Sequence, residues 1–222
     1  NHATCSPLRE MIIRIGASTD QQQVIQLAKG ALVRGGVVAC PTESFYGLAV
    51  DVGNEAAIRR LFSLKKREPG RPVLILIPST ESLSDYVTHL PPVAVPLMRA
   101  FWPGGLTLIF EASKRISPLL TGGTKTIGVR LSGHPIPTAL ARAIEGPVTG
   151  TSANISGAPP SRHAEEVMAY FGDGIDLILD GGETAGGIGS TVLNLTVDPP
   201  EMVRHGMITH EELEGVIGAV RH

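Results

Sequence analysis

The sequence predicts an α/β protein, a mixed sheet with flanking helices in a single domain. Short apolar runs bounded by Pro and Gly, such as Val37–Cys40 and Val73–Ile77, are typical of buried strands. Strands alternate with amphipathic segments in the first half of the chain and become consecutive in the second, which predicts both parallel and antiparallel pairing. The 222 residues, 42% of them hydrophobic and 18% charged, are enough for one globular core.

The domain is expected to span residues 11–222. Residues 1–10 are interpreted as an N-terminal extension or a remnant of expression, because the chain begins Asn-His-Ala and Met11 offers a native start. No apolar run approaches the ~20 residues of a membrane span, and no signal peptide is visible, so no membrane contact is expected. Neither Cys5 nor Cys40 shows metal-ligand or disulfide spacing, which favours a reducing cytoplasm, and Cys40 is expected to be a small buried hydrophobe.

The first elements are expected as a strand over 11–15, a helix begun by a Thr19/Gln22 capping box and ended by Gly35-Gly36, a strand over 37–40, a helix capped by Asn54, and a strand over 73–77. The stretch from residue 37 to 77 is interpreted as a βαβ-like unit. Ligands of such units lie beyond the carboxyl ends of the strands, where residues 41–44 fall.

The later elements are expected as a short helix over 81–86, a segment from 91 to 102, a strand over 106–110, a loop over 112–125, a strand over 126–131, a helix over 136–144, a strand over 148–151, a helix over 164–171, three strands over 177–179, 192–195 and 202–203, and a last helix over 211–220 begun by Thr209 and Glu212. The alternation of TIGVRL places Ile127 and Val129 in the core and presents Arg130 from the opposite face of the strand.

Basic residues gather where the helix after Asn54 ends. Continuing the apolar stripe from Ile58 and Leu61 by one turn reaches Lys65, which is therefore aimed at the sheet. Arg67 and Arg71 follow in the loop. Each residue taken singly could be a solvated helix-end cation, but the cluster, in a chain of net charge −2, predicts a local anion site.

Hydroxyl, amide and guanidinium groups also follow several strands, a common way to build a pocket from loops at one edge of a sheet. The groups in question are Thr42, Ser44, Arg130, Ser152, Asn154, Ser190, Thr191 and Arg204. They suit a nucleotide phosphate and a small carboxylate. The glycine run 181–189 could present N–H groups to an anion or be a simple surface turn. Metal-ligand spacing and a Ser–His or Cys–His pair are lacking, so neither a bound metal nor a covalent intermediate is predicted.

Three segments together resemble the YrdC-like family of threonylcarbamoyl-AMP synthases: PTESFYGL at 41–48, KKR at 65–67 and TSANISG at 151–157. WPG at 102–104, TIGVRL with His134-Pro135, STV at 190–192 and RHG at 204–206 fit the same pattern in the same order. Phe45, where relatives often carry a β-branched residue, and Arg71-Pro72-Val73 depart from it. Longer relatives carry an extra C-terminal domain, and the resemblance here is to the single-domain form.

The resemblance implies a twisted mixed parallel/antiparallel sheet (the YrdC-like fold) with a positively charged concave face. It implies that L-threonine, bicarbonate and ATP give threonylcarbamoyl-AMP and pyrophosphate, with Mg²⁺ on the pyrophosphate side and a separate tRNA threonylcarbamoyl transferase downstream. Lys65, Arg67, Ser152 and Asn154 would form the catalytic, phosphate-binding part of the site. Thr42, Arg71, Arg130 and Ser190 would hold threonine, while Thr126 and Arg204 would contact the nucleotide.

Three other functions remain open. One is an RNA-binding module of the same fold without synthase activity, contacting tRNA or double-stranded RNA; the net charge and the few aromatic residues count against it. A second is the related carbamoyl-transferring domain of hydrogenase maturation proteins, which would need carbamoyl phosphate. A third is a paralogue with another substrate.

Overall fold

A computed structural model describes residues 11–68 and 70–222, in which ten strands form one continuous sheet. The predictions for residues 1–10, including Cys5, lie outside the described residues. The strands are β1 Ile12–Arg14, β2 Val38–Pro41, β3 Tyr46–Ala49, β4 Leu74–Leu76, β5 Leu106–Glu111, β6 Thr126–Arg130, β7 Val148–Ser152, β8 Leu177–Asp180, β9 Thr191–Asn194 and β10 Glu201–Arg204. The α-helices are α1 Gln21–Val33, α2 Glu55–Leu64, α3 Ala94–Phe101, α4 Pro118–Thr121, α5 Pro135–Ala143, α6 Ala164–Phe171 and α7 His210–Ile217. Two short 3₁₀ helices are η2 Glu81–Asp85 and η3 Gly172–Gly174.

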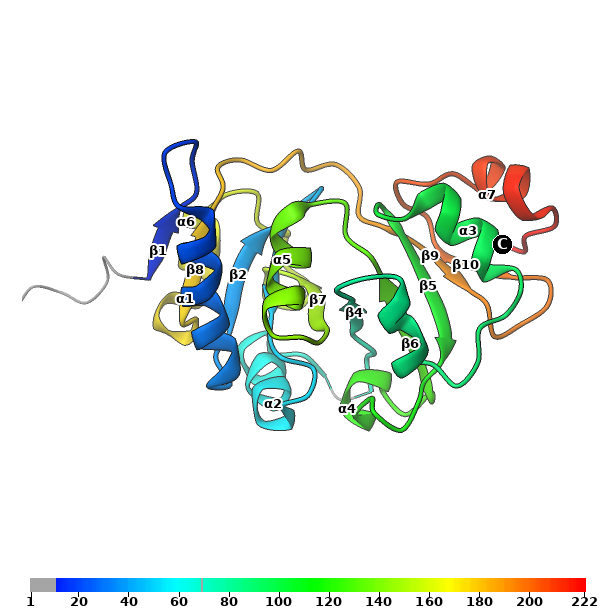
Figure 1. Cartoon of the computed structure of the whole chain (residues 1–222), viewed down its shortest axis with the longest axis horizontal. Helices are drawn as coiled ribbons and strands as arrows, with labels where there is room; N and C mark the ends of the chain where they lie inside the picture. The colour runs from blue at the N-terminus through cyan, green and yellow to red at the C-terminus, as the bar shows by residue number, and fades with distance from the viewer. Residues whose placement is uncertain (1–10, 69) are drawn as a thin grey trace, which may run out of the picture.

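The sheet is mixed, as predicted. Its order is β1-β8-β2-β3-β7-β4-β6-β5-β9-β10. Pairing is parallel at β1/β8, β8/β2, β4/β6 and β5/β9, and antiparallel at the other junctions. The chain runs back and forth across this order, so strands from both halves of the sequence become neighbours at the centre (Figure 1).

The prediction of a βαβ-like unit over residues 37–77 is wrong. After β2 the chain turns back at once into β3, which pairs antiparallel with β2 from Val38/Ala49 to Pro41/Tyr46. Strands β3 and β7 then separate β2 from β4, and each junction between them is antiparallel. The polar turn therefore belongs to a hairpin, and the buried run Tyr46–Ala49 is its second strand and not part of a connection to a helix.

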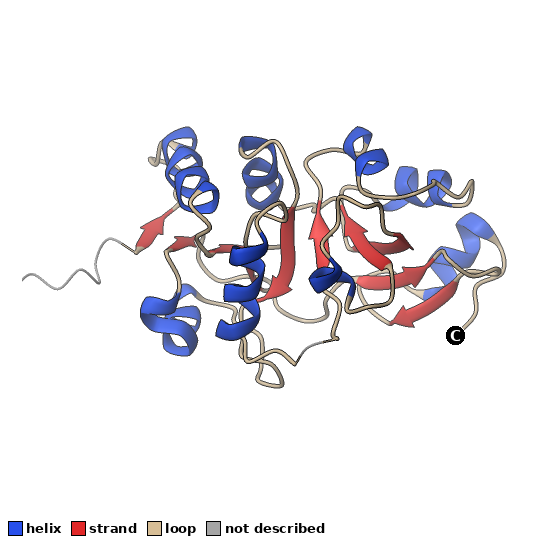
Figure 2. Cartoon of the chain, turned by 90° about the horizontal axis from the view of Figure 1, so that it is seen from below, coloured by secondary structure: helices blue, strands red, loops and turns tan. Residues whose placement is uncertain are grey.

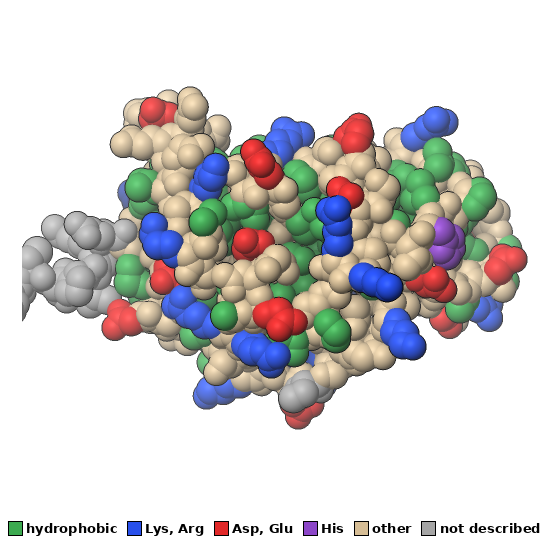
Figure 3. Space-filling model, turned by 60° about the horizontal axis from the view of Figure 1, so that its bottom comes forward, with side chains coloured by type: hydrophobic (Ala, Val, Ile, Leu, Met, Phe, Trp, Pro, Cys, Tyr) green, Lys and Arg blue, Asp and Glu red, His purple; other side chains and the backbone are tan. Residues whose placement is uncertain are grey.

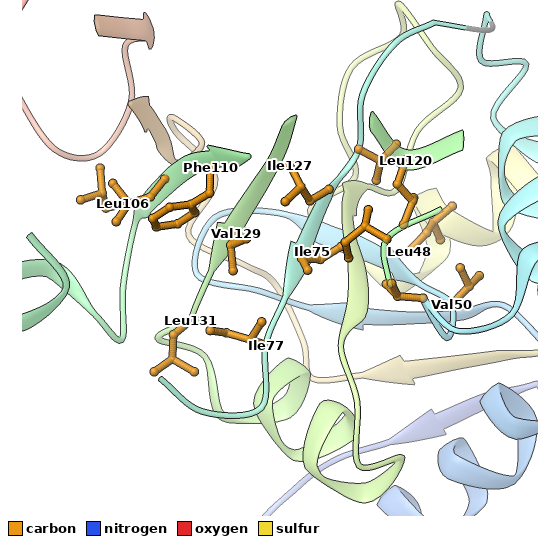
Figure 4. Packing of buried hydrophobic residues seen from close by; sticks show 14 of the residues in the cluster. Leu48, Val50, Ile75, Ile77, Leu106, Phe110, Leu120, Ile127, Val129 and Leu131 are labelled. Carbon is orange, nitrogen blue, oxygen red and sulfur yellow. The ribbon is translucent and has the colours of Figure 1, made fainter. Parts of the chain in front are cut away.

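Helices cover both faces of the sheet (Figure 2). On one face α1 and α5 pack on a cluster that includes Leu32, Cys40 and Leu140. The larger cluster lies on the other side and contains Tyr46, Ile75 and Phe110, each at most 1% exposed. Figure 4 shows its central part, where Ile75, Ile77, Ile127 and Val129 project from the middle strands. This core makes the central strands a rigid base for the loops at their ends.

Some local predictions change in detail. Helix α1 is capped by Asp20, whose carboxylate accepts from the N–H groups of Gln22 and Gln23, whereas Thr19 instead closes the preceding turn onto Gly16. The predicted loop over 112–125 contains α4, and the helix expected over 81–86 is the 3₁₀ helix η2. The Thr209/Glu212 capping box of α7 and the Asn54 cap of α2 are confirmed. In the described part of the chain, none of the helices has the length and apolar character needed to cross a bilayer.

Candidate functional site

A cavity of about 420 Å³ lies over the central strands, where the polar loops predicted from the sequence meet. Six of the ten predicted site residues line it: Thr42, Arg67, Arg130, Ser152, Ser190 and Arg204. They come from the β2–β3 hairpin, the α2–β4 connection, β6, the end of β7, the residue before β9 and β10. Among the described lining residues, the other four predicted ones, Lys65, Arg71, Thr126 and Asn154, do not occur.

Arg67 reaches the cavity because the chain turns sharply after α2. Lys65 ends the helix as its C-cap, and Lys66 takes a left-handed conformation with φ of 49°. The Arg67 side chain then donates to the main-chain oxygens of Arg71, at 3.3 Å, and Pro72, at 2.7 Å. Burial, and the nearby charge of Arg71, lower the pKa of Arg67. Arg71 itself is exposed and enters this arrangement through its carbonyl group.

Lys65 is buried, as the apolar stripe of α2 predicts, but its ammonium group is engaged by main-chain oxygens. It donates to the carbonyl oxygens of Ser152 and, at 2.7 Å, of Asn154. The carbonyl group of Lys65 in turn accepts from the N–H of Ser156 at 2.9 Å. Burial, and then the charge of Arg67, lower the pKa of Lys65 to about 8. Lys65 thus holds the loop after β7 in place, with one ammonium N–H left to offer.

The loop after β7 is fixed by its own side chains as well. Asn154 accepts from the hydroxyl of Ser152, and its amide donates to the carbonyl oxygens of Ile155 and Ala158, at 3.1 and 2.7 Å. Asn154 is 8% exposed, whereas Ser152 is exposed at the cavity. Of this pair, Ser152 therefore faces the cavity, whereas the side chain of Asn154 stabilises the loop.

Arg130 lies on the cavity wall with only 7% of its surface exposed. Its Nη1 atom is 3.6 Å from Oε2 of Glu43, while its Nε atom is buried without a hydrogen-bond partner among the described residues. Burial lowers the pKa of Arg130, and the Glu43 carboxylate opposes that shift. A buried guanidinium with unused donors facing a cavity favours the binding of an anion there.

Ser190 and Arg204 form a further part of the cavity wall. Arg204 donates from Nε and Nη2 to the carbonyl oxygen of Ser190, at 3.1 and 2.9 Å, and from Nη2 to its hydroxyl at 3.0 Å. The Ser190 hydroxyl also lies 2.8 Å from that of Thr107 on β5. Burial, and then the charge of Arg130, lower the pKa of Arg204. The two guanidinium groups of β6 and β10 are therefore close enough to repel each other.

Thr42 and Thr126 have different positions. Thr42 lines the cavity, and its hydroxyl donates to the carbonyl oxygen of Phe45 at 2.6 Å, closing the hairpin turn. Thr126 begins β6, and its hydroxyl lies 2.8 Å from that of Thr124. Its contact with a nucleotide stays a prediction. Cys40 is buried, as predicted, and burial followed by the charge of Glu43 raises the pKa of its thiol to about 12.

Sequence reasoning missed Glu43, Thr107 and His205. Glu43 supports Arg130 from the hairpin, Thr107 supports Ser190, and His205 lines the cavity beside Arg204. The one signal was Thr107, the single polar residue in the apolar run LTLIF. Glu43 stands inside the recognised PTES segment, but its partners Ser132 and Gly133 are about 90 residues away and could not be paired with it by spacing.

The described cavity wall is cationic. It carries three guanidinium groups and, among the described residues, no carboxylate. Partly buried guanidinium groups repel one another when no ligand is bound, and a bound anion would reduce that repulsion. In the described part of the chain, no three or more His, Cys, Asp or Glu residues are grouped as a metal site would need. These residues do not fit a resident metal ion.

Comparison with known proteins gives consistent results. The family model described as telomere recombination, which groups Sua5, YciO and YrdC, matches residues 30–206. The threonylcarbamoyl-AMP synthase of Pyrococcus abyssi is 41% identical over 197 residues, covering 89% of this chain and 58% of that protein. Among solved structures, P. abyssi Sua5 in complex with L-threonine superposes with a TM-score of 0.89 at 38% identity, covering 95% of this chain and 61% of the other.

The chain spans about three fifths of the length of the first curated relatives that it matches. It also matches shorter proteins nearly end to end: Escherichia coli YciO superposes with a TM-score of 0.81 at 30% identity, covering 91% of this chain and 98% of that one. The match to the family model includes the hairpin, the α2–β4 connection, the loop after β7 and the Ser190–Arg204 wall. The chain therefore belongs to the Sua5, YciO and YrdC family.

Proposed function

We propose that this protein is a threonylcarbamoyl-AMP synthase, which makes threonylcarbamoyl-AMP and pyrophosphate from L-threonine, bicarbonate and ATP. The observation that carries the proposal is the convergence of Arg67, Arg130 and Arg204 on one cavity together with the hydroxyls of Thr42, Ser152 and Ser190. Two substrates with anionic groups, the carboxylate of an amino acid and the phosphates of a nucleotide, suit such a set of cations and orienting hydroxyls. Relatives that are 41% and 39% identical to this chain bear this activity in their names.

We assign the cationic residues of the cavity to two parts, one for each substrate. Arg67 with Ser152, next to the loop that Lys65 holds, is assigned to the phosphates of ATP. Arg130 with Ser190 and Thr42 is assigned to threonine, the guanidinium binding its carboxylate. Arg204 contacts Ser190 and is close enough to Arg130 for their charges to interact, and it is assigned to the nucleotide beside the threonine part. Arg71 and Asn154 contribute through the loops that they belong to, and Thr126, at the start of β6, is assigned to the nucleotide.

The reaction then needs two bond-making steps. The neutral amine of threonine attacks the carbon of CO₂ derived from bicarbonate and loses a proton, which gives an N-carboxylate. An oxygen of that carboxylate attacks the α-phosphorus of ATP, and the bond from phosphorus to the pyrophosphate oxygen breaks. Charge gathers on the phosphoryl oxygens, so positioning and fixed cations supply the catalysis, and Arg67 is the cation best placed for it. Mg²⁺ belongs to the ATP substrate in this scheme.

Pyrophosphate release tests the proposal directly. The protein is incubated with ATP, bicarbonate and each of several amino acids in turn, and the adenylate product is identified by mass. We expect release that depends on both L-threonine and bicarbonate. Release that is independent of the amino acid, or absent with all of them, contradicts the proposed function.

The product would be consumed by a separate tRNA threonylcarbamoyl transferase in the cytoplasm. Direct contact with tRNA or double-stranded RNA is a further part of the proposal, and it would have to use the local cationic cavity. On the face shown in Figure 3, Lys and Arg side chains are interspersed with Asp and Glu and form no broad basic patch. Binding of structured RNA that weakens steeply with salt would support the contact.

A further inference from the structure

Glu43 contacts Arg130 of the cavity wall but does not itself line the cavity, and no role has yet been given to it. It stands in the β2–β3 hairpin, directly after Thr42, and its side chain is 17% exposed. One carboxylate oxygen, Oε1, accepts from the Ser132 hydroxyl at 3.0 Å and from the Gly133 N–H at 2.5 Å. The other, Oε2, is buried, lies 3.6 Å from Nη1 of Arg130, and has no hydrogen-bond partner among the described residues.

Each of these partners is placed to donate. The Gly133 N–H and the Arg130 guanidinium have no acceptor atom to offer, and only the Ser132 hydroxyl could reverse its role. A carboxylate satisfies both sides at once because it has two acceptor oxygens. A glutamine cannot, since its amide NH₂ group must face either the Gly133 N–H or the guanidinium. The site therefore requires the charge and the acceptor capacity of a carboxylate, not merely a side chain of that size.

Arg130 in turn depends on this contact. It is 7% exposed, its Nε atom has no partner, and the carboxylate of Glu43 is the one acidic group within salt-bridge distance among the described residues. The contact at 3.6 Å is long for a hydrogen bond, so the donors of the guanidinium stay available to a ligand. Glu43 thus offsets the buried charge of Arg130 without using up its hydrogen-bond donors.

We propose that Glu43 is a positioning residue that holds Arg130 against the cavity wall for an α-amino-acid carboxylate. The inference rests on the proposed function, because it assigns the Arg130 part of the cavity to the amino acid. Glu43 does not line the cavity, so it acts through Arg130 and not on the substrate. It also ties the hairpin that carries Thr42 to the turn after β6, which keeps both threonine contacts at one spacing.

The test is the Glu43→Gln variant, with equilibrium binding of L-threonine and of ATP measured separately by calorimetry and the KM of each measured by pyrophosphate release. We expect the Kd and KM for threonine to rise about tenfold or more, the effect of losing roughly one charge-assisted contact. The values for ATP should change less than about twofold, because Arg67 and Ser152 are untouched. Glu43→Asp, which keeps the charge, should recover part of the threonine affinity.

Asp176→Asn is the matched control. Its carboxylate also accepts from a main-chain N–H, that of Val37 at 2.7 Å, and from an arginine, Arg60 at 2.7 Å, but it does not line the cavity. This variant should leave the Kd for threonine unchanged. In an Arg130→Ala background Glu43→Gln should add nothing further to the loss of threonine binding, because the contact that it would break is already gone.

The outcomes separate the inference from the proposed function. If the unaltered protein neither binds threonine nor releases pyrophosphate with it, the proposed function fails. If the unaltered protein does both and Glu43→Gln leaves threonine binding as it was, the positioning role is wrong. An equal loss of threonine and ATP binding in Glu43→Gln, with a lowered melting temperature, also overturns it, because Glu43 would then support the fold in general.

Discussion

The ammonium group of Lys65 donates a hydrogen bond of 2.7 Å to the main-chain oxygen of Asn154. The same group donates to the oxygen of Ser152, and the Lys65 carbonyl accepts from the Ser156 N–H. The end of α2 is thereby joined to the end of β7 and to the first residues of the loop that follows it. Because Arg67 follows two residues later, any shift of this junction moves Arg67 and Ser152 together.

Replacing Lys65 should therefore affect both stability and rate. Lys65→Ala leaves the buried carbonyl group of Asn154 and the partly buried one of Ser152 without their donor, and we expect the free energy of unfolding to fall by about 1–3 kcal/mol. Pyrophosphate release should slow by ~10²-fold or more. Denaturant unfolding and initial rates measure the two effects. Arg59→Ala, an exposed residue of the same helix paired with Glu55 at 3.7 Å, should cost at most about 0.5 kcal/mol. Full activity in Lys65→Ala would refute the role.

The lowered pKa of Lys65 predicts a pH dependence of the rate. Since this pKa is about 8 instead of the usual 10.5, the ammonium charge is lost as the pH rises through about 8. We expect pyrophosphate release to decline above that pH. In Lys65→Arg, whose guanidinium stays charged, the decline should move to higher pH even if the rate itself is lower. An identical alkaline limb in both proteins would show that another group causes it.

The same shift predicts how stability depends on pH. Between about pH 8 and 10.5 the unfolded chain binds a proton at Lys65 that the folded chain has released. The contribution of Lys65 to the free energy of unfolding therefore rises with pH across this window and is lowest below pH 8. Comparison with Lys65→Met by denaturant unfolding at pH 7 and pH 10 isolates the effect: the difference should favour the unaltered protein more at pH 10.

Arg67 is expected to act on the phosphates directly. Arg67→Ala should lower kcat for pyrophosphate release by ~10²–10³-fold, the scale of losing one charge-stabilising group. Arg67→Lys should recover only part of it, because an ammonium cannot donate to the Arg71 or Pro72 carbonyl groups and to a phosphate with the same fork. Arg60→Ala, which breaks a pair with Asp176 outside the cavity, serves as the control. Retention of full kcat in Arg67→Ala would contradict the assignment.

Gly206 should tolerate no side chain. A Cβ atom there would overlap the main chain of Ser190 and Thr191, which carry the Arg204 contacts and begin β9. We expect Gly206→Ala to weaken ATP and threonine binding together and to lower the free energy of unfolding. Gly215 of α7 has open space around it, so Gly215→Ala should stabilise the protein by about 0.5–1 kcal/mol. Calorimetric melting of the two variants shows whether their effects have opposite signs.

Periodicity alone predicted most elements, because their buried faces are continuous in sequence. Strands β5 to β7 and helices α5 and α6 lie within a residue or two of the expected ranges, and α2 begins after its predicted cap, Asn54. Strand β3 was not predicted because it is only four residues long and follows the polar turn directly. The sequence does not show that the chain folds back after Pro41 to pair with β2. The N-cap of α1 was assigned one residue early because Thr19 and Asp20 are both good caps.

The candidate site was predicted as a set of residue types and not as a set of contacts. The stripe of α2 indicated that Lys65 is buried, but the carbonyl groups that receive it belong to a loop some 90 residues away. The pairing of Glu43 with Arg130, and of Ser190 with Arg204, likewise follows from the strand order.

By itself, the sequence determined the mixed α/β class, the cation cluster after α2, and the family segments, since each depends on residues close together along the chain. Only the tertiary structure decided which of the candidate residues face the cavity, because the sheet order brings β6, β7 and β10 together from distant parts of the sequence. The physical reason is that burial is local to a helix or strand face, whereas hydrogen bonds and ion pairs between loops depend on how those faces are assembled.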